Sequence, residues 1–343
     1  MLGEPQVGVL LKGTPKKNLV LVTGRAYPKL ANDVAKQLGI DVLKTTSYDF
    51  ADGEIYCRYT ESVRGTDAFV LQSHTQPINK WIMEQLIMID AMKRASARSI
   101  TAIVPFLGYS RQDKKHLGRE PISSRLIFDL FTTAGADRIM SVDLHAAQSQ
   151  GFFNGPVDAL QAMPLLVSYV RDSMDISNVT VVSPDAGRIR VAEQWASRLN
   201  NCPLAYIHKT RDVTCANHAV SKRVIGDVRD KDCIITDDMI DTGGTIIGAV
   251  ECLKEQGAKS VTIVATHALF NGDAVENLKN CGARKVIVTD TVPVPQKKRF
   301  DNLIVLSIAP LIAAAMKAVF TDGSVADLFA NYPEHHGKEF LLA

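Results

Sequence analysis

Residues 233–249 have the sequence CIITDDMIDTGGTIIGA, in which an apolar run meets two aspartates, then a third, and then a group of small residues. The apolar run CIITDD (233–238) predicts a buried strand, and IIGAVECLKEQ (246–256) predicts a helix after it. Glycines let the backbone between them approach a ligand closely, and N–H groups at a helix start attract an anion. The stretch therefore predicts a strand–loop–helix unit with an anion site in its loop.

The same alternation of apolar strands and amphipathic helices extends along the chain. Near-continuous apolar strands separated by helices are typical of parallel sheets that are covered on both faces. The sequence therefore predicts an α/β protein, with strands at 19–24, 68–73, 100–106, 139–145, 180–186, 233–238, 260–268, 285–290 and 303–308. Helices are expected at 29–38, 81–95 and 246–256.

An internal similarity suggests two related domains. Residues 67–106 resemble residues 232–267, and the segment 97–101 (ARSIT) matches the segment 258–262 (AKSVT). A Gly- and Pro-containing stretch near residues 155–165 separates the two halves. We expect a first domain at 1–160, a second at 161–320 and a tail at 321–343.

Composition limits the possible partners. The chain has 343 residues, 46% of them hydrophobic and 22% charged, which is ordinary for a globular protein. Its net charge of +2 gives no indication of a nucleic-acid or membrane partner. Six cysteines without a C-x-x-C pair argue against a zinc site and a disulfide framework, and predict a cytoplasmic protein. The apolar stretch 303–320 contains Pro310 and Lys317, and we expect a strand and a core helix there.

The aspartates beside the anion loop indicate what kind of anion binds. Carboxylates at a strand end suit the vicinal hydroxyls of a sugar, whereas the loop suits a phosphate. A ribose 5-phosphate unit satisfies both halves, although a capped turn with a solvated acidic rim also fits the loop alone. TDDMIDTGGTI (236–246) resembles the phosphoribosyl-binding motif of type I phosphoribosyltransferase-fold proteins.

Two further strand ends carry side chains that suit a metal or a phosphate. VVSPDAGRIR (181–190) places Asp185 where it would ligate a metal, with Arg188 close behind, and it equally fits a turn with a helix N-cap. MSVDLHAAQSQGFF (140–153) places Asp143 and His145 after an apolar strand. His145 suits Mg²⁺ or phosphate, although a histidine at a strand end is often structural.

Three polar segments complete the set. YSRQDKKHLGREPIS (109–123) is a basic stretch that suits a triphosphate, or a solvated loop. Residues 207–228 begin with Lys209 and Arg211 and predict either a loop that closes over a substrate or a surface hairpin. YDFADGEIYCRYTESVRG (48–65) predicts a projecting hairpin with its turn at residues 51–54.

Taken together, these segments closely resemble the ribose-phosphate pyrophosphokinase family over nearly the whole chain. The resemblance rests on DGEIYCRYTESVRG, RQDKK, REPIS, VDLHAAQSQGFF, SPDAG, IHKTR and DDMIDTGGTI. It implies two phosphoribosyltransferase-like (type I) domains, each a mostly parallel sheet flanked by helices. It also implies Mg²⁺-dependent transfer of the diphosphoryl group of ATP to the anomeric hydroxyl of ribose 5-phosphate, by a homohexamer.

The resemblance also implies a role for each matching residue. ATP would contact the hairpin residues Phe50, Asp52, Gly53 and Glu54 of a neighbouring subunit, together with Arg111, Gln112 and Lys114. His145 and Asp185 would ligate Mg²⁺, and Lys209 and Arg211 would be catalytic. Ribose 5-phosphate would be bound by Arg211, Asp237, Asp238, Asp241, Thr242, Gly243, Gly244 and Thr245.

Two other functions on the same fold are possible. A base phosphoribosyltransferase would need only one domain and neither the adenine-contacting hairpin nor RQDKK. A non-catalytic regulatory subunit would lose catalytic-loop residues or carry insertions, whereas Lys209 and Arg211 are present here. The chain departs from the family pattern after SPDAG, where Arg188 stands at a position that is glycine in many members.

Overall fold

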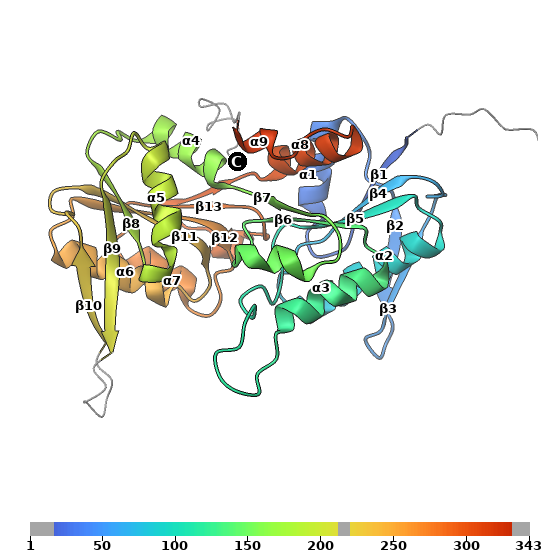
Figure 1. The fold of residues 1–343 in the computed structure, drawn as a ribbon, viewed down its shortest axis with the longest axis horizontal. Helices are drawn as coiled ribbons and strands as arrows, with labels where there is room; N and C mark the ends of the chain where they lie inside the picture. Colours follow the sequence, from blue (N-terminus) through green and yellow to red (C-terminus); the bar gives the residue numbers. More distant parts are fainter. Residues whose placement is uncertain (1–16, 212–219, 331–343) are drawn as a thin grey trace, which may run out of the picture.

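The computed structural model describes residues 17–211 and 220–330, and for 209–211 and 220–222 it describes the backbone only. The first half of the chain forms a parallel sheet with the strand order β1-β4-β5-β6-β7. The strands are β1 (Leu19–Thr23), β4 (Asp67–Leu71), β5 (Ser99–Val104), β6 (Arg138–Val142) and β7 (Val157–Leu160). Helix α1 (Pro28–Leu38) covers one face, and α2 (Ile78–Arg94) and α3 (Ser123–Ala134) cover the other (Figure 1).

The second half forms a larger sheet with the order β10-β9-β8-β11-β12-β13-β14, in which only β9 and β10 are antiparallel. Its strands are β8 (Val179–Ser183), β9 (Leu204–Arg211), β10 (Val220–Ile225), β11 (Asp232–Ile240), β12 (Ser260–Ala268), β13 (Lys285–Thr289) and β14 (Leu303–Leu306). Its helices are α4 (Met163–Ser173), α5 (Ile189–Arg198), α6 (Gly244–Glu255), α7 (Ala274–Asn280), α8 (Ala309–Phe320) and α9 (Asp327–Ala330). The predicted α/β class with parallel, helix-flanked sheets is confirmed.

The internal similarity has a structural counterpart. Strand β4 pairs with β5 so that Asp67 lies opposite Ser99, and β11 pairs with β12 so that Asp232 lies opposite Ser260. In each pair the serine hydroxyl donates to the aspartate, over 2.7 Å in the first sheet and 2.6 Å in the second. The two halves therefore use the same side-chain contact at the same place in their sheets.

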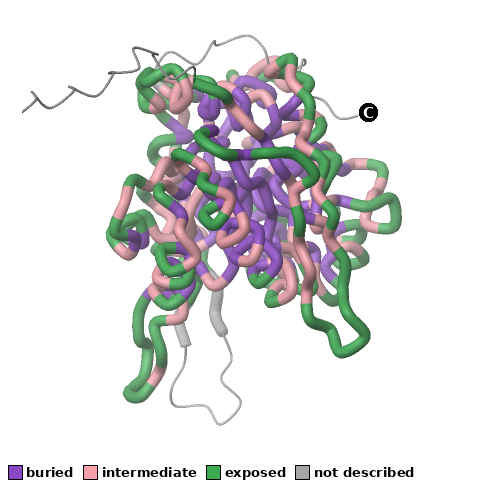
Figure 2. The backbone as a smooth tube through the Cα atoms, turned by 90° about the vertical axis from the view of Figure 1, so that its right-hand side faces the viewer, coloured by how far each residue is buried: buried purple, intermediate pink, exposed green. Residues whose placement is uncertain are grey.

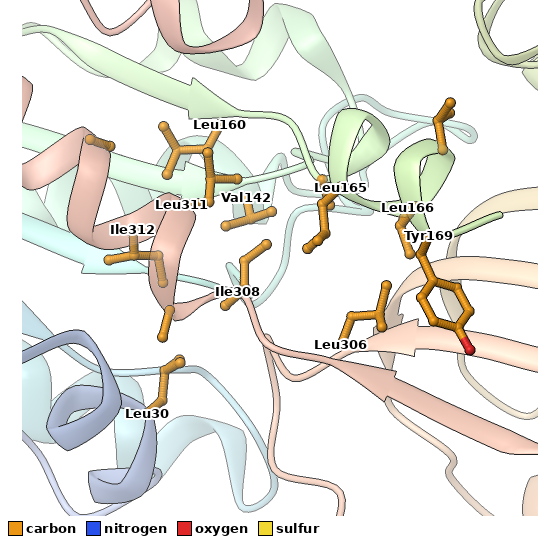
Figure 3. Close-up of a cluster of buried hydrophobic side chains, with 14 of the residues drawn as sticks. Leu30, Val142, Leu160, Leu165, Leu166, Tyr169, Leu306, Ile308, Leu311 and Ile312 are labelled. Atoms are coloured by element: carbon orange, nitrogen blue, oxygen red, sulfur yellow. The ribbon is translucent and has the colours of Figure 1, made fainter. Parts of the chain in front are cut away.

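One hydrophobic core spans both sheets. Helix α8 follows the last strand of the second sheet but packs beside α1 of the first (Figure 1). Figure 3 shows Ile312 and Leu311 of α8 in the same cluster as Leu30 of α1, and Leu165 and Leu166 of α4. Because these side chains are almost completely buried, the two halves are held together by apolar contact as well as by the site described below. Figure 2 shows the buried backbone in the centre of the molecule and exposed segments around it.

The 48–65 segment forms the predicted hairpin, with strands β2 (Thr45–Asp49) and β3 (Ile55–Tyr59) paired to each other only. It projects at the end of the molecule away from the second sheet (Figure 1). Glycine 53 occupies its turn with φ of +93°, a conformation that favours glycine. The proposed tail beyond residue 330 lies outside the described residues.

Several predicted strand bounds were wrong. The strands predicted at 68–73, 100–106, 139–145 and 303–308 end two or three residues earlier, at Leu71, Val104, Val142 and Leu306. The residues just beyond these ends leave the sheet, and Asp143 does so with φ of +40°. Strand β7 was not predicted, because it is short, and β9 and β10 were expected only under the hairpin alternative for residues 207–228. No helix in residues 17–211 or 220–330 combines the length and apolar character that crossing a bilayer requires.

Candidate active site

Three strand ends meet at the centre of the candidate site. Strand β6 leads to His145 in the first sheet, and β8 leads to Asp185 in the second. Strand β11 continues past the end of β8 and carries Asp237 and Asp238 beyond it. Ligands of open parallel sheets bind at the carboxyl ends of the strands. The structure thus brings the predicted histidine and the predicted acidic pair to one place.

Asp238 contacts side chains from both halves of the chain. Its Oδ2 lies 2.6 Å from Nδ1 of His145 and 2.6 Å from Nη2 of Arg188. The same nitrogen of Arg188 lies 2.9 Å from Nδ1 of His145. The carboxylate of Asp238 is only 9% exposed, so these contacts are largely shielded from water. Asp238 was predicted to face ribose hydroxyls, and within the protein its carboxylate contacts His145 and Arg188.

These contacts decide which nitrogen of the His145 ring is available. A guanidinium only donates hydrogen bonds, and a carboxylate only accepts them. Nδ1 of His145 cannot both donate to Asp238 and accept from Arg188. The shorter contact, 2.6 Å to the carboxylate of Asp238, favours a proton on Nδ1, and Nη2 of Arg188 then donates to Asp238 and not to the ring. The neutral ring then presents the lone pair of Nε2 to the site. A carboxylate that fixes a histidine in this way is a common arrangement behind metal-binding imidazoles.

The two adjacent carboxylates have opposite pKa shifts. Burial, followed by the charge of Asp238, raises the pKa of Asp237. Burial would also raise the pKa of Asp238, but the hydrogen bond from His145 and the charge of Arg188 outweigh it and hold that pKa well below its ordinary value. Asp238 is therefore the ionised member of the pair, and Asp237 is the member that more readily holds a proton.

A second set of contacts fixes the loop that carries His145. The half-buried carboxylate of Asp143 accepts hydrogen bonds from Thr266 Oγ1 over 2.6 Å and from the Ala162 N–H over 3.2 Å. Its backbone oxygen lies 3.2 Å from Nε2 of His267. The loop that carries His145 is thus fixed to strand β12 of the second sheet. Thr266 and His267 were not among the predicted site residues, although their position at a strand end is a signal that would have found them.

The predicted phosphate loop connects β11 to α6. Gly243 has φ of +81°, and a Cβ there would lie only 3.1 Å from Cδ1 of Ile247. Gly243 is therefore required by both backbone conformation and space. Thr242, Gly244 and Thr245 are exposed, and a Cβ on Gly244 would meet nothing within 4 Å. The N-terminus of α6 is consequently open to an anion.

Asp241 in this loop contacts the first half of the chain. Its Oδ2 accepts a hydrogen bond from Nη1 of Arg111 over 2.6 Å, and its Oδ1 accepts one from Asn271 over 2.7 Å. Arg111 and Gln112 lie in the loop after β5 and line a cavity of about 320 Å³ together with Asn271. Lys114 is exposed nearby in the same loop. The structure therefore places the predicted ATP segment next to the predicted ribose 5-phosphate segment.

The four hairpin residues lie elsewhere. Phe50 is 46% exposed, and Asp52, Gly53 and Glu54 are exposed beside it. The N–H of Glu54 donates to Oδ1 of Asp52 over 3.1 Å, which fixes the turn. The hairpin is at the far end of the first sheet from β11 and β12 (Figure 1), so these side chains do not approach the site of their own chain.

The structure describes the backbone of the two predicted catalytic residues, Lys209 and Arg211, but not their side chains. Lys209 and Arg211 lie at the end of β9, which pairs with β8 and so belongs to the sheet that carries Asp185. Their side chains are outside the described residues, as is most of the predicted catalytic loop. Their strand position agrees with the hairpin alternative for residues 207–228, because β9 and β10 pair in antiparallel register.

The side chain of Asp185 has a structural role in the turn before α5. Its Oδ1 accepts the N–H of Gly187 over 2.9 Å and so caps the turn before α5, as sequence analysis allowed. In the described part of the chain no three His, Cys, Asp or Glu side chains form a metal cage. A hydrated Mg²⁺ needs only one or two protein ligands plus substrate phosphates. A carboxylate such as that of Asp185 and an imidazole such as that of His145 are groups that can serve as these ligands.

Two mostly parallel α/β sheets with a glycine-containing loop at their junction are typical of a two-domain phosphoribosyltransferase-type protein. A family model for the N-terminal domain of ribose phosphate pyrophosphokinase matches residues 19–135, and one for a phosphoribosyl synthetase-associated domain matches residues 212–330. A ribose-phosphate pyrophosphokinase of Bifidobacterium longum is 71% identical over 98% of this chain and 100% of its own length. The chain belongs to the ribose-phosphate pyrophosphokinase family.

Other relatives support the same family. A ribose-phosphate pyrophosphokinase of Mycobacterium tuberculosis is 58% identical over 92% of this chain and 96% of its own length. The crystal structure of phosphoribosylpyrophosphate synthetase from Mycobacterium smegmatis matches with a TM-score of 0.86 and 60% identity, over 90% of this chain and all of that one. The protein is a transferase that synthesises phosphoribosyl pyrophosphate.

Proposed function

We propose that this enzyme uses ATP and Mg²⁺ and that the residues at the junction of its two sheets carry the reaction. The oxygen of the anomeric hydroxyl of ribose 5-phosphate forms a bond to the β-phosphorus of ATP. The bond from that phosphorus to the bridging oxygen of the α-phosphate breaks, AMP leaves, and the hydroxyl loses its proton. The observation that carries the proposal is the contact of Asp241 with Arg111, which joins the sugar-phosphate loop to the nucleotide loop.

The sugar phosphate would bind to the loop after β11. Backbone N–H groups of residues 242–245 would hold the 5-phosphate, because this loop opens at the N-terminus of α6. Asp237 and Asp238, further back along β11, would face the ribose hydroxyls. Both ends of the ligand then lie along one strand and its loop, and the anomeric hydroxyl points toward the first sheet.

The nucleotide would bind on the opposite side of the same junction. Arg111 and Lys114 supply positive charge, and Gln112 supplies an amide for the base or the ribose. The cavity behind Arg111 gives this loop room to adjust when the substrate enters. Since phosphoryl transfer depends mainly on positioning and charge neutralisation, these groups are the kind that the reaction requires.

His145 and Asp185 would hold Mg²⁺, which neutralises phosphate charge and orients the diphosphoryl group when it is bound. The role of Asp238 is to keep the His145 ring in the tautomer that exposes Nε2. Lys209 and Arg211 would stabilise the charge that develops on the transferred group. All of these residues come from strand ends of the two sheets.

The hairpin would act in a neighbouring subunit of a hexamer. Tyr48 and Tyr56 stack with ring centroids 4.8 Å apart and support Phe50 on an exposed tip. An exposed aromatic ring on a short rigid hairpin suits stacking against an adenine. Because the tip lies far from the site of its own chain, an adenine contact requires another copy.

We place the enzyme in the cytoplasm.

The direct test is AMP formation by the purified protein with Mg²⁺. AMP should form only when both ATP and ribose 5-phosphate are present, and a chelator should abolish it. If the assembled protein releases AMP without ribose 5-phosphate, or releases none with both substrates, the proposed reaction is wrong.

A further inference from the structure

The side chain of Arg188 occupies the centre of the acidic cluster. Arg188 ends the short turn at Ala186–Arg188 and caps α5, and its side chain is 19% exposed. Its Nη2 lies 2.6 Å from Oδ2 of Asp238, and its Nε lies 3.7 Å from Oδ1 of Asp237. One guanidinium therefore spans both carboxylates of the pair.

No other lysine or arginine competes for these carboxylates among the side chains that the structure describes. The other ionisable partner of Asp238 within ion-pair distance there is His145. A buried acidic pair needs a nearby cation, because two adjacent carboxylates repel each other in a medium of low polarity. Arg188 supplies that cation from within the chain.

The same guanidinium stands where a divalent cation would be attracted. Its Nη2 is 2.9 Å from the ring of His145, which is one of the two side chains that we assign to Mg²⁺. The ionised carboxylate of Asp238, with Asp237 beside it, forms the negative potential that would draw the ion toward His145. A fixed positive charge between these three groups cancels part of that potential and repels a second cation.

We propose that Arg188 is a positioning residue that acts as the internal counter-ion of the substrate-free site. It holds Asp237 and Asp238 in place and competes with a divalent cation for them, so that the free enzyme binds the ion weakly. The ion is then bound well only with the negatively charged substrates, which also offer the guanidinium a new partner. This inference rests on the proposed binding of a divalent cation beside Asp237 and Asp238.

The inference predicts that removing the charge of Arg188 strengthens metal binding by the protein alone. Arg188→Gln keeps N–H donors for Asp238 but removes the positive charge, whereas Arg188→Lys keeps the charge. In the absence of substrates, Arg188→Gln should bind Mn²⁺ about tenfold more tightly than the wild type, because a unit charge within a few ångströms of the ion is lost. Arg188→Lys should bind Mn²⁺ as the wild type does.

The experiment is a titration of Mn²⁺ into substrate-free protein, with unbound Mn²⁺ measured by electron paramagnetic resonance. Arg198→Gln is the matched control, because Arg198 is an exposed residue in the last turn of the same helix, α5, and the substitution changes the net charge equally. Its Mn²⁺ affinity should stay at the wild-type value. Thermal unfolding of each variant verifies that it is folded.

The titrations test the counter-ion role of Arg188 separately from the metal-ligand role of His145. Unchanged or weaker Mn²⁺ binding by folded Arg188→Gln overturns the inference, as does equal strengthening in Arg188→Lys or Arg198→Gln. His145→Ala, titrated in parallel, should weaken Mn²⁺ binding. If His145→Ala leaves binding unchanged while Arg188→Gln strengthens it, the counter-ion role stands and the assignment of His145 as a metal ligand is wrong.

Discussion

Nη1 of Arg111 lies 2.6 Å from Oδ2 of Asp241, and these two residues belong to loops of different sheets. Both side chains are partly solvated, so the pair contributes little to stability. Its importance is geometric, because it fixes the distance between the loop that we propose for the nucleotide and the loop that we propose for the sugar phosphate. Asn271 holds the other oxygen of Asp241 and keeps the carboxylate turned toward Arg111.

Replacing Asp241 by asparagine should mainly weaken the binding of ribose 5-phosphate. The substitution removes the charge that Arg111 contacts and loosens the loop whose N–H groups we propose as the 5-phosphate site. We expect a KM for ribose 5-phosphate that rises about tenfold or more, with a smaller change in kcat. Asp90→Asn is the control, because Asp90 forms an exposed ion pair with Arg94 on α2. An unchanged KM in Asp241→Asn would count against the assigned role.

Replacing Lys209 by alanine should reduce turnover and spare substrate binding. A cation that acts on the transferred group contributes mainly in the transition state, and the loss of one such contact typically costs about 10²–10³ in rate. Calorimetric titration with ribose 5-phosphate should give a dissociation constant close to that of the wild type. A variant whose binding weakens as much as its kcat falls would show that Lys209 is a binding residue.

Replacing Asp238 by asparagine should change the tautomer of His145. The amide of asparagine can donate to Nδ1, so the lone pair is no longer confined to Nε2. The loss of a carboxylate behind a metal-binding imidazole typically costs about 10–100-fold in metal affinity. Nitrogen chemical shifts of labelled histidine report the tautomer, and Mn²⁺ titration reports the affinity. If the tautomer stays the same, Asp238 does not orient the ring.

Much of this site could be predicted from the sequence patterns of the strands. Apolar runs predicted most of the strands, and they predicted that Asp185 and the acidic pair follow strands of one half of the chain and that His145 follows a strand of the other. The loop at 242–245 was recognisable from its glycines, and the structure shows that Gly243 needs a positive φ. These features depend on residues that are close in the sequence, which is why they were predictable.

Other features depend on distant parts of the chain and were not predicted. Nothing in SPDAGRIR shows that Arg188 turns toward Asp238 and not toward a phosphate or solvent. The packing of α8 against α1 also joins distant parts of the chain, because residues 309–320 follow the last strand of the second sheet. The contact of Arg111 with Asp241 likewise links residues that are far apart in sequence. Such contacts are decided by how the two sheets meet, and local patterns do not encode that.

Two inactive variants should restore activity when they are co-expressed. Phe50→Ala would remove the adenine contact that one subunit gives to its neighbour, and Lys209→Ala would remove a catalytic cation from its own site. If the hairpin acts between subunits, random assembly at equal amounts leaves about a quarter of the sites with both residues intact. Purified mixed oligomers should then show roughly that fraction of wild-type activity. Activity no greater than that of the two parents would mean that the hairpin serves its own chain.

Asp290 should make stability depend on pH. Its carboxylate is 1% exposed, accepts the Ile308 N–H over 2.6 Å and lies 3.5 Å from the Tyr27 hydroxyl of the first half. Burial is the largest cause that raises the pKa of Asp290 to about 7. Because the folded state holds the proton more tightly than the unfolded state, the stabilisation is complete below about pH 4 and is lost as the pH rises to about 7. Asp290→Asn cannot ionise, so its unfolding temperature should fall less between pH 5 and pH 8 than that of the wild type. Equal falls in both proteins would show that Asp290 does not titrate in this range.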